Sequence, residues 1–190
     1  MVNSQDINIL VIIPAKADSK RLIGKNKRVL AGFTLLEHAI KFSQKSSYVK
    51  EIIVTTEDNE TAKIAQKYGV TVVGREQEFM GEREVADVYV KVFNELENND
   101  SFTHVVGVQP DHPDRTVELD NLLEYAVNNK YDDLFTVNKD GSRNGSVRII
   151  KAAHVRSENV SRRVGSVFDF CTNIHSEQDL LNAEENIKNR

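Results

Sequence analysis

Short β-branched apolar runs alternate with amphipathic segments along this chain, and this alternation constrains the fold most. The first run, residues 7–13, is almost entirely apolar and stops at Pro14. Such a run is typical of a strand that is buried on both faces of a parallel sheet. Residues 34–46 then carry apolar side chains at helical spacing, with Thr34 and Glu37 placed to form a capping box. A doubly buried strand followed by such a helix predicts a layered α/β structure.

The alternation continues to the end of the chain. Further strands are predicted at residues 51–56, 70–73, 103–108, 133–137 and 147–151. Further helices are predicted at residues 57–68, 84–96, 117–127 and 177–187, with Gly69 ending the first of them. The expected class is therefore α/β, with a mainly parallel sheet covered by helices on both faces. No repeat or linker divides the chain, so residues 1–190 are expected to form a single domain.

Charge and composition exclude several classes of protein. The chain has 29 acidic and 25 basic side chains, and its net charge of -4 gives no general attraction for nucleic acid. Its longest apolar run is far shorter than the roughly 20 residues that cross a bilayer, so no membrane partner is expected. The first residues are too polar for a secretory signal, and Cys171 is the single cysteine. We therefore expect a cytoplasmic protein.

The loop that follows the first strand is unusually basic. Residues 14–28 hold six cations and one acid, and small side chains there let the backbone approach a ligand closely. Ligands of open α/β sheets bind beyond the carboxyl ends of the strands, which is where this loop lies. It matches neither the P-loop nor the dinucleotide motif. Composition alone leaves two interpretations open, a cradle for a polyphosphate and a solvated charged loop.

Residues 13–26, which read IPAKADSKRLIGKN, resemble the opening signature of the CMP-sugar synthetases, cytidylyltransferases that act on sialic acids and related 2-keto acid sugars. The resemblance implies a three-layer α/β/α nucleotide-diphospho-sugar transferase fold, which is glycosyltransferase-A-like and Rossmann-like. It gives Lys16 the place of the usual arginine and makes Lys25 the phosphate-binding lysine. Asp18 departs from the pattern and would repel phosphate. The implied nucleotide contacts are Pro14, Ala15, Lys16, Ser19, Lys20, Lys25, Asn26, Arg75 and Gln109.

A second stretch, residues 108–116, reads VQPDHPDRT and resembles two signatures of this family. One is LQPTSPLRT, and the other is the VQGDEP of the CMP-KDO synthetases, whose aspartate binds magnesium. The resemblance implies that Asp111 holds Mg²⁺ and acts in catalysis with Lys16 and Lys25. It implies acceptor contacts for Arg115 and Asn144. From the residues alone, turn formation by Asp111 and Asp114 is the alternative, and His112 is expected at the surface.

The chain departs from the family pattern in two places. Near the last helix, Asn173 and His175 stand where the family has acidic metal ligands, so His175 is a second metal candidate and weaker or altered metal binding is expected. Residues 138–143 replace a long excursion that shapes the sugar pocket and builds the dimer in the family. Two interpretations are open for five further arginines, a clamp that binds a carboxylate and a solvated basic face. These residues are Arg143, Arg148, Arg156, Arg162 and Arg163.

These observations predict a cytidylyltransferase that uses Mg²⁺ and transfers CMP from CTP to an acidic 2-keto sugar, releasing pyrophosphate. The predicted partners are CTP and the sugar, and a homodimer is left open. Two alternatives remain at this point. One is another sugar or polyol nucleotidyltransferase of the same fold, which base identity would separate. The other is a nucleotide-binding homologue with impaired catalysis, which Asn173 and His175 favour.

Overall fold

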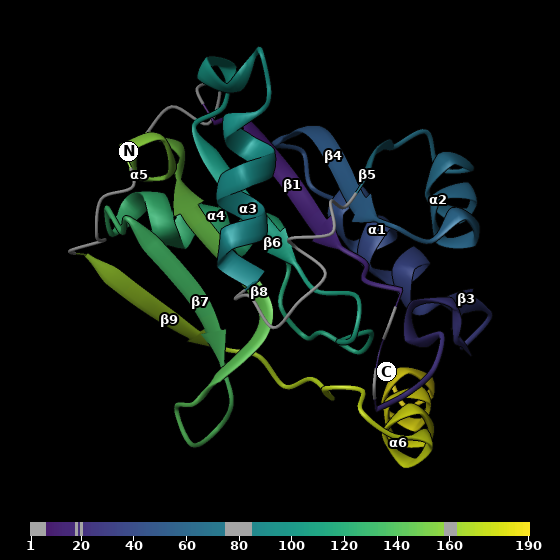
Figure 1. The fold of residues 1–190 in the computed structure, drawn as a ribbon. Helices are drawn as coiled ribbons and strands as arrows, with labels where there is room; N and C mark the ends of the chain where they lie inside the picture. Colours follow the sequence, from purple (N-terminus) through teal and green to yellow (C-terminus); the bar gives the residue numbers. More distant parts are fainter. Residues whose placement is uncertain (1–6, 18, 20, 75–84, 158–162) are drawn as a thin grey trace.

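A seven-stranded sheet forms the centre of the computed structural model, which describes residues 7–17, 19, 21–74, 85–157 and 163–190. Its strands run in the order β5-β4-β1-β6-β8-β7-β9 (Figure 1). Their bounds are β1 Ile9–Pro14, β4 Val49–Thr56, β5 Thr71–Gly74, β6 His104–Val108, β7 Asp133–Val137, β8 Arg143–Lys151 and β9 Val164–Phe168. A small ribbon is formed by β2 Val29–Leu30 and β3 Phe33–Thr34. The first strand is central, as the sequence predicted.

The sheet is mainly parallel, which confirms the expected class. Its antiparallel member is β8, which pairs antiparallel with both β6 and β7. A short turn joins β7 to β8, in which the Asn138 amide donates to the Ser142 carbonyl at 2.8 Å and Gly141 has a φ of 83°. This turn extends β8 back to Arg143, four residues before the predicted start at Val147. The edge strand β9 was not predicted.

Five of the six described α-helices follow the predicted order, and the short helix at Ala152–Ser157 was not predicted. The helices are α1 Leu35–Gln44, α2 Asn59–Gln66, α3 Val85–Asn94, α4 Leu119–Asn128, α5 Ala152–Ser157 and α6 Glu177–Lys188, together with the 3-10 turns η2 Lys25–Lys27 and η4 Asn99–Ser101. The capping box of α1 is confirmed, since Thr34 and Glu37 exchange both hydrogen bonds. Asp58 caps α2, which therefore begins at Asn59, and Gly69 takes a φ of 68° in the turn after it. Glu84 lies outside the described residues.

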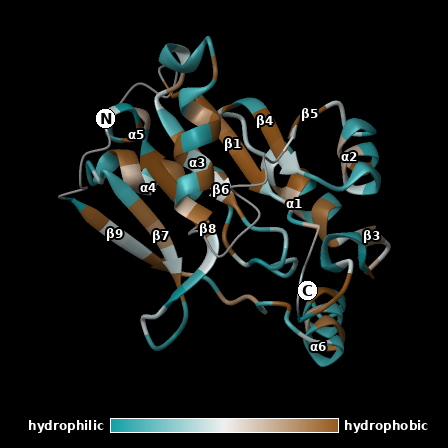
Figure 2. Ribbon diagram, viewed as in Figure 1, coloured by the Kyte–Doolittle hydropathy of each residue, from teal (hydrophilic) through white to brown (hydrophobic). Residues whose placement is uncertain are grey.

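The core fills both faces of the sheet. Ile9, Val11 and Ile13 pack into one cluster with residues of α1, α2 and α4. Leu10 and Ile12 point to the opposite face and pack against α3 and α5. This alternation explains the uninterrupted apolar run, because both sides of β1 are covered. Figure 2 shows the hydrophobic colouring along β1 and β4 between the helices.

A third apolar cluster lies beyond the carboxyl ends of the strands. It joins Leu22 of the basic loop and Leu30 of β2 to Ile174 and to Leu180 of α6. The last helix therefore sits beside the β2–β3 ribbon, away from the sheet (Figure 1). This packing places the C-terminal segment against the basic loop. None of the described helices is long and apolar enough to cross a membrane.

Candidate active site

An ion pair joins the two stretches that the sequence singled out. Gly24, with a φ of 63°, turns the chain into η2, and Lys25 opens that turn. The Lys25 ammonium donates to Asp111 Oδ2 at 2.5 Å and to the Ile174 carbonyl at 3.2 Å. The two side chains are only 16% and 14% exposed. The basic loop after β1 and the loop after β6 thus meet at the carboxyl edge of the sheet.

The C-terminal segment completes this meeting point. The Ile174 amide donates to the Asp111 carbonyl at 2.9 Å, which sets the next residue, His175, beside the ion pair. The His175 ring nitrogens lie 2.9 and 3.0 Å from Arg21 Nη1. Burial, together with the charges of Arg21 and Lys25, lowers the pKa of His175. We therefore expect a neutral imidazole there at pH 7.

Asp111 is an ionised carboxylate that is largely buried. Burial by itself would raise its pKa, but contacts with His112 and Lys25 outweigh burial and hold the pKa well below its ordinary value. The expectation of a surface His112 is wrong, because this side chain is fully buried. Within the loop after β6, residues 109–116, which we call the shelf, the chain turns inward after Pro110. His112 Nδ1 lies 3.0 Å from Asp111 Oδ1.

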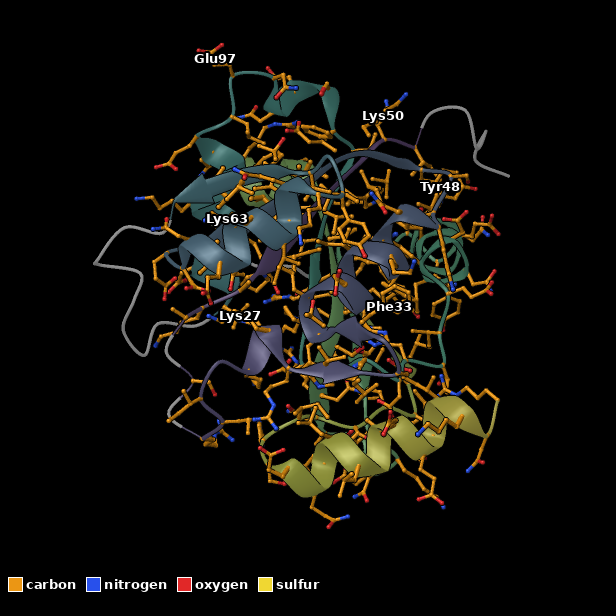
Figure 3. The ribbon with its side chains drawn as sticks, turned by 90° about the vertical axis from the view of Figure 1, so that its right-hand side faces the viewer. Lys27, Phe33, Tyr48, Lys50, Lys63 and Glu97 are labelled. Atoms are coloured by element: carbon orange, nitrogen blue, oxygen red, sulfur yellow. The ribbon has the colours of Figure 1, made fainter. Side chains whose placement is uncertain are left out.

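Internal ion pairs neutralise part of the basic loop. Lys27 lies against α2, where its ammonium is 2.5 Å from Glu60 and 3.3 Å from Asp58 (Figure 3). Arg28 pairs with Glu177 of α6. Among the described residues, no acidic side chain forms an ion pair with Lys16. Among the described loop lysines, Lys16 therefore has no acidic partner, and Lys25 pairs with Asp111 at the site itself.

Hydrogen bonds fix the path of this loop. The Ala15 amide donates to the Thr55 carbonyl at 2.9 Å, and Pro14 is the last residue of β1. Asn26 Nδ2 donates to the Lys16 carbonyl at 2.8 Å, and Ser19 Oγ accepts from the Leu22 amide at 3.2 Å. In this structure Asn26 and Ser19 therefore shape the loop. Lys20, Asp18 and Arg75 lie outside the described residues.

Glu57 also holds the loop, although it was not predicted as a site residue. Its Oε1 accepts from the Ala17 amide at 2.8 Å. The one available signal was its position, since it is a carboxylate directly after the predicted second strand. Because carboxyl ends of neighbouring parallel strands lie side by side, that position faces the loop after β1.

The shelf after β6 rests on buried polar groups. The Arg115 guanidinium donates to the backbone carbonyls of Gln109 and Ser146, and this side chain is 8% exposed. Asn144 is also buried, and its Oδ1 accepts from Thr136 Oγ1 at 2.6 Å and from the Ser146 amide at 3.0 Å. Arg115 and Asn144, the predicted contacts to the acceptor sugar, are thus hydrogen-bonded within the protein, and the bonds of Arg115 hold the shelf to β8.

A cavity of about 240 Å³ opens next to this shelf. It is lined by Val85, Ala86, Tyr89, Gln109, Phe135, Arg143, Gly145, Val147 and Arg148. Gly145 has a φ of 80°, and a Cβ there would lie 2.8 Å from Gln109 Nε2, so the glycine lets Gln109 lie across it. A larger cavity of about 370 Å³ lies between α1 and the start of α4, and neither cavity is lined by Lys16, Lys25 or Asp111.

The structure separates the five candidate arginines. The Arg143 guanidinium lies 3.9 Å above the Phe135 ring and lines the shelf cavity. Arg148 lines it too, but makes two bonds to Asp133 at 3.0 and 2.7 Å. Arg156 donates to the carbonyls of the loop that precedes β6. Arg163 precedes β9 beside the start of β7, at the other end of that strand from Arg143, and Arg162 is not among the described residues.

The candidate metal ligands provide one carboxylate. Within the described residues, no group of three or more His, Cys, Asp and Glu side chains is placed to hold a metal ion. Asp111 Oδ1 is buried and makes no hydrogen bond, while His175 faces Arg21 and Asn173 is exposed. Mg²⁺ often takes only one or two carboxylates and completes its coordination with substrate phosphates and water. The Asp111 carboxylate fits a cation of that kind.

Comparison with known proteins identifies the family. A sequence model of the family described as cytidylyltransferase matches residues 10–186. This chain belongs to the cytidylyltransferase family.

Several curated cytidylyltransferases are similar to the chain. It is 37% identical over 125 residues to the CMP-N,N'-diacetyllegionaminic acid synthase of Legionella pneumophila, covering 64% of this chain and 52% of that protein. It is 29% identical over 128 residues to the 3-deoxy-manno-octulosonate cytidylyltransferase of Rickettsia typhi, covering 66% and 51%. The chain therefore spans about half the length of these curated relatives.

Solved structures share the cytidylyltransferase fold. A CMP:2-keto-3-deoxy-manno-octonic acid synthetase complexed with CTP superposes with a TM-score of 0.74 at 13% identity, covering 96% of this chain and 99% of that one. The 4-diphosphocytidyl-2C-methyl-D-erythritol synthase of Anaerococcus prevotii gives a TM-score of 0.63 at 13% identity, covering 97% of each chain. At these identities the likeness establishes the fold, and it confirms the fold that the sequence signatures implied.

Proposed function

We propose that this cytidylyltransferase transfers CMP from CTP to a hydroxyl of an acidic 2-keto sugar and releases pyrophosphate. The observation that carries the proposal is the meeting of Lys25, Asp111 and the loop of Lys16 at one edge of the sheet. Two cations and one ionised carboxylate are the groups that a triphosphate and its metal ion require. The names of the curated relatives, which concern legionaminic acid and 3-deoxy-manno-octulosonate, support the sugar class.

The side chains would act by charge and by position. The acceptor oxygen attacks the α-phosphorus, the bond to the bridging oxygen of the β-phosphate breaks, and the hydroxyl proton passes to solvent. Lys25 would turn from Asp111 to a phosphate, and Lys16 would join it in offsetting the charge of the departing pyrophosphate. Asp111, freed from Lys25, would hold Mg²⁺. The positive charge of this ion would offset the negative charge of the phosphate oxygens. Arg115 would keep the shelf in place through the Gln109 carbonyl.

A nucleotide panel tests this proposal. We expect CTP with Mg²⁺ to raise the melting temperature by several degrees, and ATP, GTP and UTP to raise it less, because a ligand that binds only the folded state stabilises it. The measurement is a thermal unfolding scan at equal nucleotide concentrations. Equal shifts for all four nucleotides would refute the cytidine assignment.

We assign to Arg143 the binding of the carboxylate of the acceptor sugar. Its guanidinium lines the shelf cavity, while that of the neighbouring Arg148 is held by Asp133. We expect R143Q to raise the KM for a 2-keto acid sugar about tenfold or more, since a charged hydrogen bond contributes about 1.5–3 kcal/mol. The KM for CTP should stay unchanged. R163Q, at the other end of β7, is the matched control. Steady-state pyrophosphate release gives both constants, and equal effects of the two variants would exclude Arg143.

A nucleotide-binding homologue with impaired catalysis is the second candidate. It is favoured by Asn173 and His175, and by the single carboxylate that the described residues place at the candidate metal position. This candidate predicts selective CTP binding without pyrophosphate release across a panel of 2-keto acid sugars. Release with any one of these sugars would exclude it.

A further inference from the structure

His112 is a fully buried imidazole that the proposed chemistry does not use. It lies on the shelf directly after Asp111, and none of its surface reaches solvent. Its Nδ1 is 3.0 Å from Asp111 Oδ1, while the other carboxylate oxygen accepts from Lys25. The Asp111 carboxylate is therefore contacted from two sides, by a lysine that faces the site and by a histidine that faces the interior.

The contact between His112 and Asp111 is incomplete in this structure. Buried polar atoms are nearly always hydrogen-bonded. Here Asp111 Oδ1 and both ring nitrogens of His112 are buried without a well-aligned partner, although Nδ1 and Oδ1 are within hydrogen-bond distance. Hydrogen bonds in unliganded active sites are often poorly aligned and improve when ligand binds. A small rotation of the carboxylate would align this pair, and release of Oδ2 by Lys25 would permit that rotation.

We propose that His112 is a positioning residue for Asp111, which donates from Nδ1 to Oδ1 and keeps Oδ2 turned toward the ligand. This inference rests on the proposed function, in which Lys25 leaves Asp111 for the nucleotide. Among the described residues, Asp111 would then lose its side-chain partner on the site side, and the bond from His112 would prevent the carboxylate from turning inward. A histidine that merely fills space would not bond to Oδ1 and so would not keep Oδ2 turned toward the ligand.

The first test needs no nucleotide. NMR of the wild-type protein with ¹⁵N-labelled histidine reports which ring nitrogen of His112 carries a proton. We expect a proton on Nδ1 that exchanges slowly with water, and we expect D111A to shift its resonance. A ring protonated on Nε2 alone would overturn the proposal, because such a ring cannot donate to Asp111.

The second test uses a matched pair of variants. Asparagine can place an N–H near the position of Nδ1, whereas leucine fills similar space without a donor. We expect H112L to weaken binding of CTP with Mg²⁺ about tenfold and H112N to weaken it less than threefold. Titration calorimetry gives the affinities, and unliganded melting temperatures show that both variants fold. In a D111A background, H112L should cause no further loss.

The outcomes separate this inference from the proposed function. Equal losses in H112L and H112N, or an undiminished loss in the D111A background, would overturn the role of His112. Absence of CTP binding by the wild-type protein would instead overturn the proposed function, and the NMR result would still decide whether His112 bonds to Asp111.

Discussion

The variant K25A is expected to keep the fold while losing most of the stabilisation that CTP provides. The Lys25 side chain contacts Asp111 and the Ile174 carbonyl at the carboxyl edge of the sheet and belongs to none of the apolar clusters. Its ammonium would supply charged contacts to the triphosphate, and losing them would weaken binding about 100-fold. Wild-type protein at 100 times its Kd gains about 2.7 kcal/mol from the ligand, and the variant at that concentration would gain well under 1 kcal/mol.

The matched control for K25A is K27A. Lys27 lies in the same 3-10 turn, but its ammonium pairs with Glu60 and Asp58 at α2. Thermal scans with and without CTP would compare both variants with the wild type. We expect K27A to retain nearly all of the shift. Retention of the shift in K25A, or equal losses in both variants, would show that Lys25 does not bind the nucleotide.

The variant D114A is expected to lower the free energy of unfolding by about 3 kcal/mol, because it removes a buried charged acceptor and leaves its donors unpaired. Asp114 is fully buried. It accepts from the Thr172 amide at 2.7 Å, from Thr172 Oγ1 at 2.8 Å and from Asn186 Nδ2 at 2.7 Å. This carboxylate therefore ties the shelf to the C-terminal segment that bears His175.

Urea unfolding measures this effect. The control is D100A, since the Asp100 side chain is 93% exposed and pairs only at the surface with Arg156. An exposed pair contributes little, so D100A should change stability by less than about 1 kcal/mol. D114A should also expose the segment before α6 to proteases. A D114A variant as stable as D100A would contradict the structural role assigned to Asp114.

Local patterns predicted most of the secondary structure. Prediction of β1 needs no tertiary information, because an uninterrupted run of apolar side chains indicates burial on both faces of the strand. The capping box of α1 is equally local, with Thr34 and Glu37 three residues apart. The antiparallel β8 and the edge strand β9 depend on the turn at Gly141 and on pairing between distant segments. A pattern of single strands carries no information on those pairings.

The segments that form the candidate site were predicted from the sequence, whereas the contact partners of their side chains were not. The basic loop and the shelf each carried a recognisable signature, and the rule on strand ends placed them together. The burial of His112 depends on the inward turn of the shelf. The pairing of Lys27 and Arg28 depends on where α2 and α6 pack. Residue types alone could not show these contacts, because each joins segments that only the fold brings together.

A crystal structure with CTP and Mg²⁺ tests the central claim most directly. We expect the triphosphate to lie along the loop after β1, with the Lys25 ammonium moved from Asp111 to a phosphate oxygen and Lys16 beside it. The cytosine should lie at the carboxyl edge of the sheet. The claim would be contradicted if Lys25 stayed bonded to Asp111 and the nucleotide were bound elsewhere. It would also be contradicted if no nucleotide bound although the crystal leaves the carboxyl edge of the sheet accessible.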